Sequence, residues 1–176
     1  GAQRPSHRGH KDLNVVKVAR PTGTQFLQAG GAAELSMRAL PDARTSSRSP
    51  GDEVVLCTAG DGTTSEGEFW EALNTACNLK LPVVFLIEDN GYAISVTVSQ
   101  SQSTPDLADR ARGVGIQPAL VDGNDVMAVR EAAKRAVSEI RAGRGPAFIE
   151  CKTVRWERHS AFSSGTYANP AEAQKW

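Results

Sequence analysis

The chain lacks long hydrophobic runs and has no net charge. No apolar stretch in its 176 residues approaches the roughly 20 residues that a membrane-spanning helix needs, and the N-terminus has no signal-like apolar core. Its 20 basic and 20 acidic side chains balance, so no general attraction to nucleic acid or to an anionic membrane follows from charge. The composition indicates a soluble globular protein with neither type of partner, and we expect it in the cytoplasm.

Cysteine is also scarce. The three cysteines, Cys57, Cys77 and Cys151, are far apart and no pair has metal-ligand spacing. We therefore expect buried free thiols rather than a disulfide or a zinc site. A length of 176 residues with 40% apolar side chains is typical of one domain with a substantial core, so we expect a single domain over residues 1–176.

Acidic charge is concentrated in the middle of the chain. Residues 51–110 contain two basic and ten acidic side chains, whereas the segments on either side are net basic. Glu66, Glu68 and Glu71 have an ordinary explanation, because acidic side chains favour the first turns of a helix. The same charge would also help to hold a divalent cation, and the sequence is compatible with both interpretations.

Residues 54–90 predict a strand, a helix and a second strand. Val54–Cys57 is a short, β-branched run of the kind found in strands buried on both faces. Ser65 and Glu68 have the spacing of a capping box, so Ser65 should begin the helix. Pro82 disfavours helix at the residue before it, and the second strand should cover residues 83–87.

Polar residues follow both of these strands. Asp61 comes after the first and Asn90 after the second, so both should lie at the carboxyl edge of a parallel sheet, where open α/β sheets bind ligands. Carboxylate and amide oxygens suit Mg²⁺, and the N–H groups of a turn and a helix N-terminus suit phosphate. Gly60 and Gly62 let the backbone turn sharply and approach a ligand. The alternative is that Asp61 is only a turn residue.

Strand and helix alternate through the rest of the chain, which predicts an α/β fold with a parallel sheet covered by helices on both faces. Gly30 and Gly31 in the first helix predict close approach by another backbone, since glycine is costly inside a helix. Asp125 is the expected cap of the most regular helix. The remaining elements are helices over residues 24–40, 104–112 and 126–140, strands over 117–121 and 146–151, and loops over 42–52 and 96–106.

Gly-Asp-Gly, 27 residues and then Asn90 is similar to the thiamine-diphosphate motif. The longer stretch AGDGTTSEGEFWEALNTACNLKLPVVFLIEDNGYAIS resembles the α-type subunit or half of the first, decarboxylating component of 2-oxoacid dehydrogenase complexes. This resemblance extends over most of the chain, from PSHRGH near the N-terminus to Arg155 and His159–Ser160. It implies a thiamine-diphosphate-binding fold and oxidative decarboxylation of a 2-oxo acid, with acyl transfer to a lipoyl group.

The resemblance also implies roles for individual residues. In the family, the matching side chains of Asp61 and Asn90 and the backbone carbonyl of Tyr92 hold Mg²⁺. The backbone at Gly60, Gly62 and Thr63 lies against the diphosphate. Pro21, Thr24 and Gln25 match positions that hold a potassium ion in some members, and this partial match leaves K⁺ as an optional component.

Residues 154–176 match the family's active-site loop and tail. Arg155 and His159 are spaced as in the family's YRxxGHS loop, in which the histidine contacts the diphosphate and takes part in catalysis. The loop departs from the family at Arg158, where glycine is common, and it lacks an aspartate after the serines. Ser160 matches a position that is phosphorylated in some relatives. His7 and His10 match a stretch near the active-site entrance.

The family's catalytic site is shared between two chains. The glutamate that activates the aminopyrimidine ring lies on a β-type chain or half, and no counterpart is found here. We therefore expect a β-type partner in a heterotetramer and a lipoyl-bearing acyltransferase as acceptor. The family has a longer α-type region in front of this segment, so we expect a fragment or a truncated form.

The identity of the 2-oxo acid is less constrained. NGYAIS at residues 90–95 resembles the branched-chain enzymes more than the pyruvate enzymes. Alternatives are a pyruvate or acetoin dehydrogenase component, or a non-catalytic domain that binds cofactor or stabilises an assembly. A nicotinamide-binding fold is disfavoured because no Gly-x-Gly-x-x-Gly follows the first strand.

Overall fold

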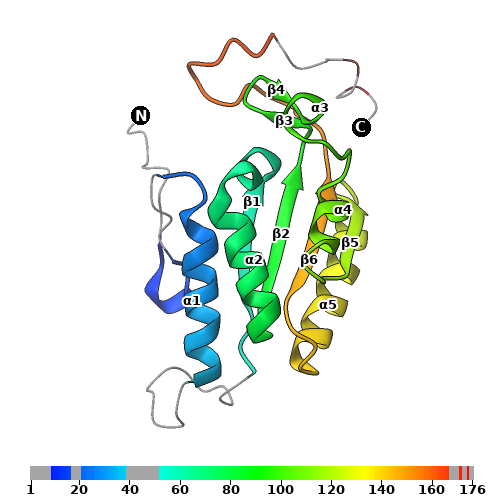
Figure 1. Ribbon diagram of the computed structural model, residues 1–176. Coiled ribbons are helices and arrows are strands. Elements are labelled where there is room, and N and C mark those ends of the chain that lie inside the picture. Colours follow the sequence, from blue (N-terminus) through cyan, green and yellow to red (C-terminus); the bar gives the residue numbers. More distant parts are fainter. Residues whose placement is uncertain (1–8, 17–20, 39–51, 167–170, 172–173, 175–176) are drawn as a thin grey trace.

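The computed structural model describes residues 9–16, 21–38, 52–166, 171 and 174 (Figure 1). Its elements, in chain order, are η1 (Lys11–Leu13), α1 (Thr24–Arg38), β1 (Val55–Gly60), η2 (Asp61–Ser65), α2 (Gly67–Leu79), β2 (Val83–Asp89), β3 (Tyr92–Ala93), β4 (Val96–Thr97), α3 (Val98–Ser101), α4 (Leu107–Arg112), β5 (Pro118–Asp122), α5 (Val126–Arg141) and β6 (Ala147–Lys152).

The main sheet is parallel, as predicted. Its four described strands lie in the order β1-β2-β6-β5, and every neighbouring pair runs in the same direction. The central strands β2 and β6 are apolar runs buried on both faces over most of their length, as expected of strands that helices cover from two sides. In this strand order β6 pairs directly with β2, although about sixty residues separate them in sequence.

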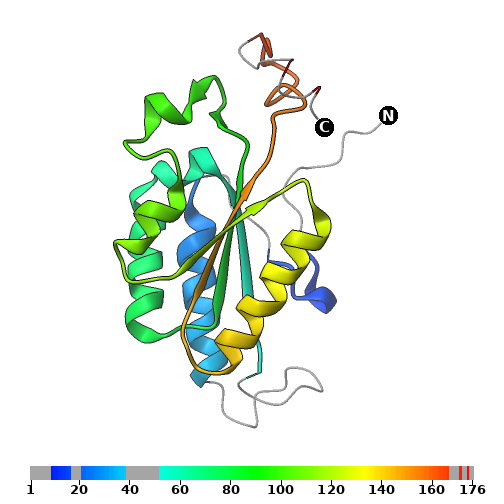
Figure 2. The same ribbon diagram turned by 90° about the vertical axis from the view of Figure 1, so that its right-hand side faces the viewer.

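Helices cover both faces of this sheet, which confirms the predicted fold class. Figure 2 shows α5 on one side and α1, α2 and α4 on the other. The larger core lies under the three helices and centres on Phe26, Phe69, Phe85 and Phe148; the rings of Phe26 and Phe69 are tilted, with centroids 4.7 Å apart. A smaller core lies between α5 and the opposite face of the sheet. The predicted cap of α5 is confirmed, because the Asp125 side chain accepts bonds from two backbone N–H groups of its first turn.

The helix after β1 begins later than predicted. Residues 61–65 form the 3₁₀ turn η2, and α2 starts at Gly67 with Glu66 as an N-cap that makes no side-chain bond. The hydroxyl of Thr64 donates to the carbonyl of Asp61 at 2.6 Å, closing the turn on itself. The predicted start at Ser65 is therefore wrong, because the backbone first makes a tight turn at the sheet edge.

The segment predicted as a loop over residues 96–106 is partly regular. β3 and β4 form a short antiparallel hairpin, and α3 follows directly. Thr97 and Gln100 form the capping box that the sequence pattern had indicated at Ser65 and Glu68. The hairpin and α3 lie above the carboxyl end of β2 (Figure 1).

Two further expectations concern the start of the chain. A Cβ atom at Gly30 or Gly31 would meet no atom of the described residues within 4 Å, so the described part of the chain does not contain the close backbone approach predicted along α1. His7 and most of the predicted 42–52 loop lie outside the described residues.

None of the helices in the described part of the chain has the length and apolar character needed to span a bilayer.

Candidate functional site

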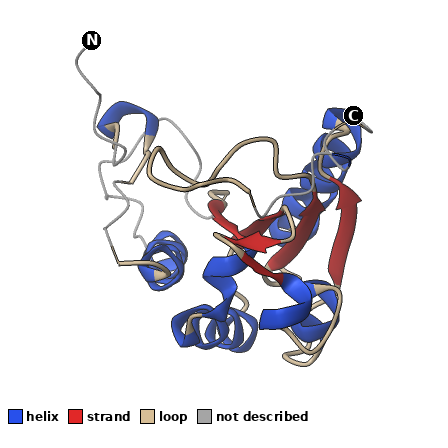
Figure 3. Cartoon of the chain, turned by 90° about the horizontal axis from the view of Figure 1, so that it is seen from above, coloured by secondary structure: helices blue, strands red, loops and turns tan. Residues whose placement is uncertain are grey.

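Strand register brings the predicted site residues together. Gly60 at the end of β1 is the partner of Glu88 in β2. Asp61 therefore leaves the sheet beside the turn that begins at Asp89 and carries Asn90. Figure 3 views the molecule from this carboxyl end of the strands. Two residues almost thirty positions apart thus occupy the same edge, which is the arrangement that the strand–helix–strand pattern predicts.

Asp61 is a buried acid, with only 2% of its surface exposed. Burial raises its pKa above the ordinary value, and the negative charge of Asp89 adds to this effect. Hydrogen bonds from the backbone N–H groups of Asp61 and Asn90, and the positive charge of Arg155, lower the pKa in opposition. A cation bound here would stabilise the ionised carboxylate, so the environment of Asp61 fits a metal ligand.

The other two predicted metal ligands converge on one positive charge. Nη2 of Arg155 donates to Oδ1 of Asn90 at 3.2 Å and to the carbonyl oxygen of Tyr92 at 3.0 Å. Oδ1 of Asn90 also accepts the N–H of Tyr92 at 3.2 Å, which holds the turn together. Arg155 also acts on Asp61 through its charge, which lowers the pKa of that carboxyl. Oδ1 of Asn90 and the carbonyl oxygen of Tyr92 therefore face the same guanidinium, with the buried Asp61 at the same edge of the sheet.

The two glycines around Asp61 have different surroundings. A Cβ atom at Gly62 would lie 2.6 Å from Cβ and 2.9 Å from Cα of Ala93, whereas one at Gly60 would meet only the carbonyl oxygen of Glu88, at 3.9 Å. At Gly62 the close neighbour is Ala93 of the hairpin, where η2 packs against β3, and the predicted approach to a ligand stays a prediction. The role of Gly60, Gly62 and Thr63 beside a diphosphate stays a prediction.

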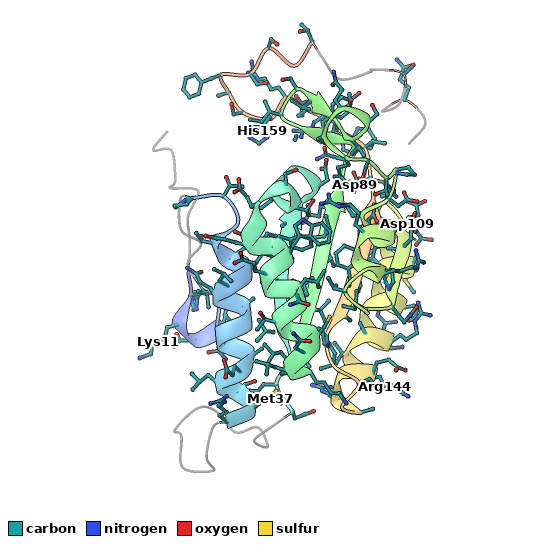
Figure 4. All side chains as sticks on the ribbon, viewed as in Figure 1. Lys11, Met37, Asp89, Asp109, Arg144 and His159 are labelled. Atoms are coloured by element: carbon teal, nitrogen blue, oxygen red, sulfur yellow. The ribbon has the colours of Figure 1, made fainter. Side chains whose placement is uncertain are left out.

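His159 lies in the exposed segment above the sheet, at the same end of the molecule as Asp89 (Figure 4). This is the end that carries Asp61 and Asn90, but contact between His159 and a cofactor stays a prediction. His10 is exposed and forms a β-bridge with Val15. At the suggested potassium site, the Thr24 hydroxyl donates to the Pro21 carbonyl at 3.1 Å, and that ion also stays a prediction.

Sequence reasoning did not find the charged cluster behind this edge. Nζ of Lys152 lies 2.7 Å from Asp89, 2.8 Å from Asp106 and 2.9 Å from Glu150. Burial tends to lower the pKa of Lys152, but the bonds to these three carboxylates raise it overall. Burial raises the pKa of Glu150. The signal in the sequence was the presence of Asp89, Glu150 and Lys152 at the ends of strands that are otherwise apolar.

The candidate metal site depends on a mixed set of oxygens. Among the residues that the structure describes, no group of three or more His, Cys, Asp or Glu side chains is arranged to hold a metal ion. The set formed by Asp61, Asn90 and Tyr92 contains one carboxylate, one amide and one backbone carbonyl. Mg²⁺ accepts such oxygens and completes its shell with water and phosphate, so this set suits a metal that binds together with a phosphorylated ligand.

Comparison with known proteins identifies the family. The sequence profile of the dehydrogenase E1 component matches residues 1–176, which is the whole chain. The chain belongs to the dehydrogenase E1 component family. This membership agrees with the α/β fold, and the family's cofactor is thiamine diphosphate.

Several E1 relatives align with the chain. The mouse mitochondrial 2-oxoisovalerate dehydrogenase subunit alpha is 36% identical over 177 aligned positions, covering 100% of this chain and 38% of the relative. The 3-methyl-2-oxobutanoate dehydrogenase subunit alpha of Mycobacterium tuberculosis is 39% identical over 157 aligned positions, which cover 89% of this chain and 40% of the relative. The pyruvate dehydrogenase E1 component subunit alpha of Porphyra purpurea is 39% identical over 130 aligned positions, which cover 73% of this chain and 38% of the relative. The chain thus spans about two fifths of the length of these relatives.

Proposed function

We propose that this chain supplies the Mg²⁺–diphosphate half of the active site in a thiamine-diphosphate-dependent 2-oxoacid dehydrogenase. The observation that supports this is the convergence of Oδ1 of Asn90 and the Tyr92 carbonyl on Arg155, with the buried carboxylate of Asp61 at the same carboxyl edge of the sheet. Thiamine diphosphate, when bound, supplies the carbanion-stabilising chemistry for loss of CO₂ from a 2-oxo acid. The protein's part is to bind and orient this cofactor.

The described residues divide this task among themselves. The Asp61 carboxylate, Oδ1 of Asn90 and the carbonyl oxygen of Tyr92 would hold Mg²⁺, whose charge would help to retain the diphosphate. Backbone groups at Gly60, Gly62 and Thr63 would line the diphosphate, since N–H groups in a tight turn favour an anion. His159 would approach from the loop above the sheet and donate a proton or hydrogen bond to the diphosphate. K⁺ near Thr24 remains optional.

The proposed reaction requires partners. A β-type subunit would provide the glutamate for the aminopyrimidine ring in a heterotetramer, and a lipoyl acyltransferase would accept the acyl group. The names of the mouse and mycobacterial relatives favour a branched-chain 2-oxo acid as substrate. The red algal relative supports pyruvate as an alternative, and acetoin remains a further one. A cytoplasmic location also remains a proposal.

Isothermal titration calorimetry of the full-length protein tests the cofactor site. We expect thiamine diphosphate to bind tightly only when Mg²⁺ is present, and Asp61→Ala to abolish this binding. Asp109→Ala is a matched control, because Asp109 is exposed and pairs only with Arg112 among the contacts described. Binding that is independent of the metal, or that survives Asp61→Ala, would contradict the proposed site.

Turnover assays test the partner and the substrate. We expect no decarboxylation by this chain alone and activity after addition of the β-type subunit. Comparison of kcat/KM for branched-chain 2-oxo acids, pyruvate and acetoin identifies the substrate. Robust turnover without a partner would defeat the shared-site proposal. Cofactor binding without turnover, even in the presence of the partner, would instead support a non-catalytic binding or assembly domain.

A further inference from the structure

Lys152 is surrounded by acceptors from three segments of the chain. Besides its ion pairs with Asp89, Asp106 and Glu150, its Nζ donates to the Pro105 carbonyl at 3.2 Å. The side chains of Asp89 and Glu150 are 3% and 0% exposed, whereas that of Lys152 is 38% exposed. Two buried carboxylates therefore depend on one cation that reaches them from the end of β6. Removing that cation would leave both charges buried without a counter-charge.

Asp89 connects this cluster to the candidate metal site. Oδ2 of Asp89 binds Lys152 at 2.7 Å, while Oδ1 accepts the N–H of Gly91 at 2.9 Å. The carbonyl oxygen of Asp89 accepts the N–H of Thr153 at 2.8 Å. The carboxylate is thus held on one side by Lys152 and holds, on its other side, the turn over residues 89–92. That turn carries both Asn90 and Tyr92.

We propose that Lys152 is a positioning residue, whose ion pair with Asp89 fixes the turn that presents Asn90 and Tyr92 to Mg²⁺. This inference rests on the proposed function. Lys152 touches none of the three proposed metal ligands in any contact described, so it would act through Asp89. Residues that orient metal ligands from behind contribute about 10–100-fold to metal affinity.

The charge of Lys152 makes this role testable by the direction of the effect. A positive side chain close to a metal site disfavours a cation, so loss of Lys152 should tighten metal binding if only electrostatics matters. If Lys152 positions the turn, its loss should weaken binding instead. Substitution of Asp89 changes the charge in the opposite direction, because it removes a negative charge near the metal site, and electrostatics alone would then weaken metal binding. Only positioning predicts weaker binding for both variants.

The experiment measures the affinity of the full-length protein for Mn²⁺, used as a paramagnetic probe for Mg²⁺, in the presence of thiamine diphosphate. Free Mn²⁺ is followed by electron paramagnetic resonance. We expect Lys152→Met and Asp89→Ala each to weaken binding by about 10-fold or more, and Lys152→Arg to stay close to wild type. Asp106→Ala is the charge-matched control, because the contacts described join Asp106 to the same lysine and to no residue of the turn. Lys134→Met on the exposed face of α5 controls for the substitution itself.

Each outcome decides the inference. Wild-type or tighter Mn²⁺ binding in a folded Lys152→Met variant overturns it, as does a loss in Asp106→Ala equal to that in Asp89→Ala. If circular dichroism shows that Lys152→Met does not fold, Asp89→Ala and Lys152→Arg decide, and unchanged binding in Asp89→Ala overturns the inference. If wild-type protein shows no cofactor-dependent Mn²⁺ binding, the proposed function itself fails, which is a distinguishable result.

Discussion

Gly60 and Gly62 flank the same aspartate but have different structural roles. Gly60 has an extended backbone that any residue adopts, with φ −80°, and a side chain there would meet an atom only at ordinary contact distance. Gly62 has no such room, because Ala93 of the hairpin lies against it. The glycine that the site requires is therefore the second one, and the reason is packing between η2 and β3.

This difference predicts that the same substitution has different effects on stability at Gly60 and at Gly62. Gly62→Ala should lower the free energy of unfolding by about 1–3 kcal/mol, since the new methyl group forces η2 and β3 apart. It should also weaken Mg²⁺-dependent cofactor binding, because Tyr92 precedes Ala93. Gly60→Ala is the control for stability, and its free energy of unfolding should stay close to that of the wild type. Denaturant unfolding monitored by circular dichroism checks both variants, and equal stability of the two would contradict the packing argument.

Cys57 is predicted to be chemically inert in the folded protein. Burial raises its pKa from 9.0 to about 12, which leaves about 1,000-fold less thiolate at pH 8. Iodoacetamide should therefore modify half-buried Cys77 first and Cys57 only after unfolding, as peptide mass spectrometry would show. Because the folded pKa lies above the unfolded one, the stability that Cys57 contributes is lost as the pH rises from 9.0 towards 12. Rapid alkylation of Cys57 in the native protein would refute the prediction that this thiol is chemically inert.

Among the elements, α1 contains two glycines that its packing does not require. Gly31 is exposed, and a Cβ atom there would meet no atom within 4 Å among the residues that the structure describes. Glycine in a helix interior costs up to ~1 kcal/mol relative to alanine, so Gly31→Ala should raise the free energy of unfolding by about that amount.

Gly23, just before the same helix, is the matched control for this prediction. Its φ is +93°, and a Cβ atom there would lie 3.0 Å from Cβ of Glu66. Gly23→Ala should therefore destabilise the protein, because alanine resists this backbone conformation. Thermal unfolding of both variants tests the pair. A destabilised Gly31→Ala variant would show that the glycines of α1 have a role that the described contacts do not include.

Local patterns predicted element type better than element boundaries. The β-branched runs and the helical periodicity of α5 gave correct elements, because strong burial dominates there. The same capping pattern occurs at Ser65–Glu68 and at Thr97–Gln100, but only the second forms a capping box. At the first, the Thr64 hydroxyl bonds to the Asp61 carbonyl, and the chain makes a 3₁₀ turn instead. Gly62 in that turn packs against Ala93 of the hairpin, which is a tertiary contact that a local pattern does not contain.

At the scale of the whole molecule, strand order determines which residues meet. The pairing of Asp61 with Asn90 was predictable, because consecutive strands joined by one helix commonly lie side by side. Arg155 and Lys152 reach the same edge only because β6 inserts between β2 and β5. Sequence order does not reveal that insertion. The sequence therefore predicted that Asp61 and Asn90 lie together, whereas the cluster around Lys152 could be found only once the strand order was known.

Cofactor binding should stabilise the whole domain, because a ligand that binds only the folded state shifts the unfolding equilibrium. At a free concentration 100 times the dissociation constant, the stabilisation is about 2.7 kcal/mol. For a two-state domain of roughly 150–250 residues this corresponds to a rise in Tm of about 5–10 °C. Thiamine diphosphate with Mg²⁺ should produce this shift in differential scanning calorimetry, and EDTA should reverse it.

The variants separate this specific effect from general stabilisation by ligand or salt. Asp61→Ala should abolish the rise in Tm, since it removes the only carboxylate among the proposed metal ligands. Asp109→Ala should retain the full rise. Lys152→Met should need a higher metal concentration for the same shift, because its proposed effect is on metal affinity and the stabilisation at saturation is set by mass action. An equal shift in EDTA would mean that the diphosphate binds without the metal, and the oxygens of Asn90 and Tyr92 would then need another explanation.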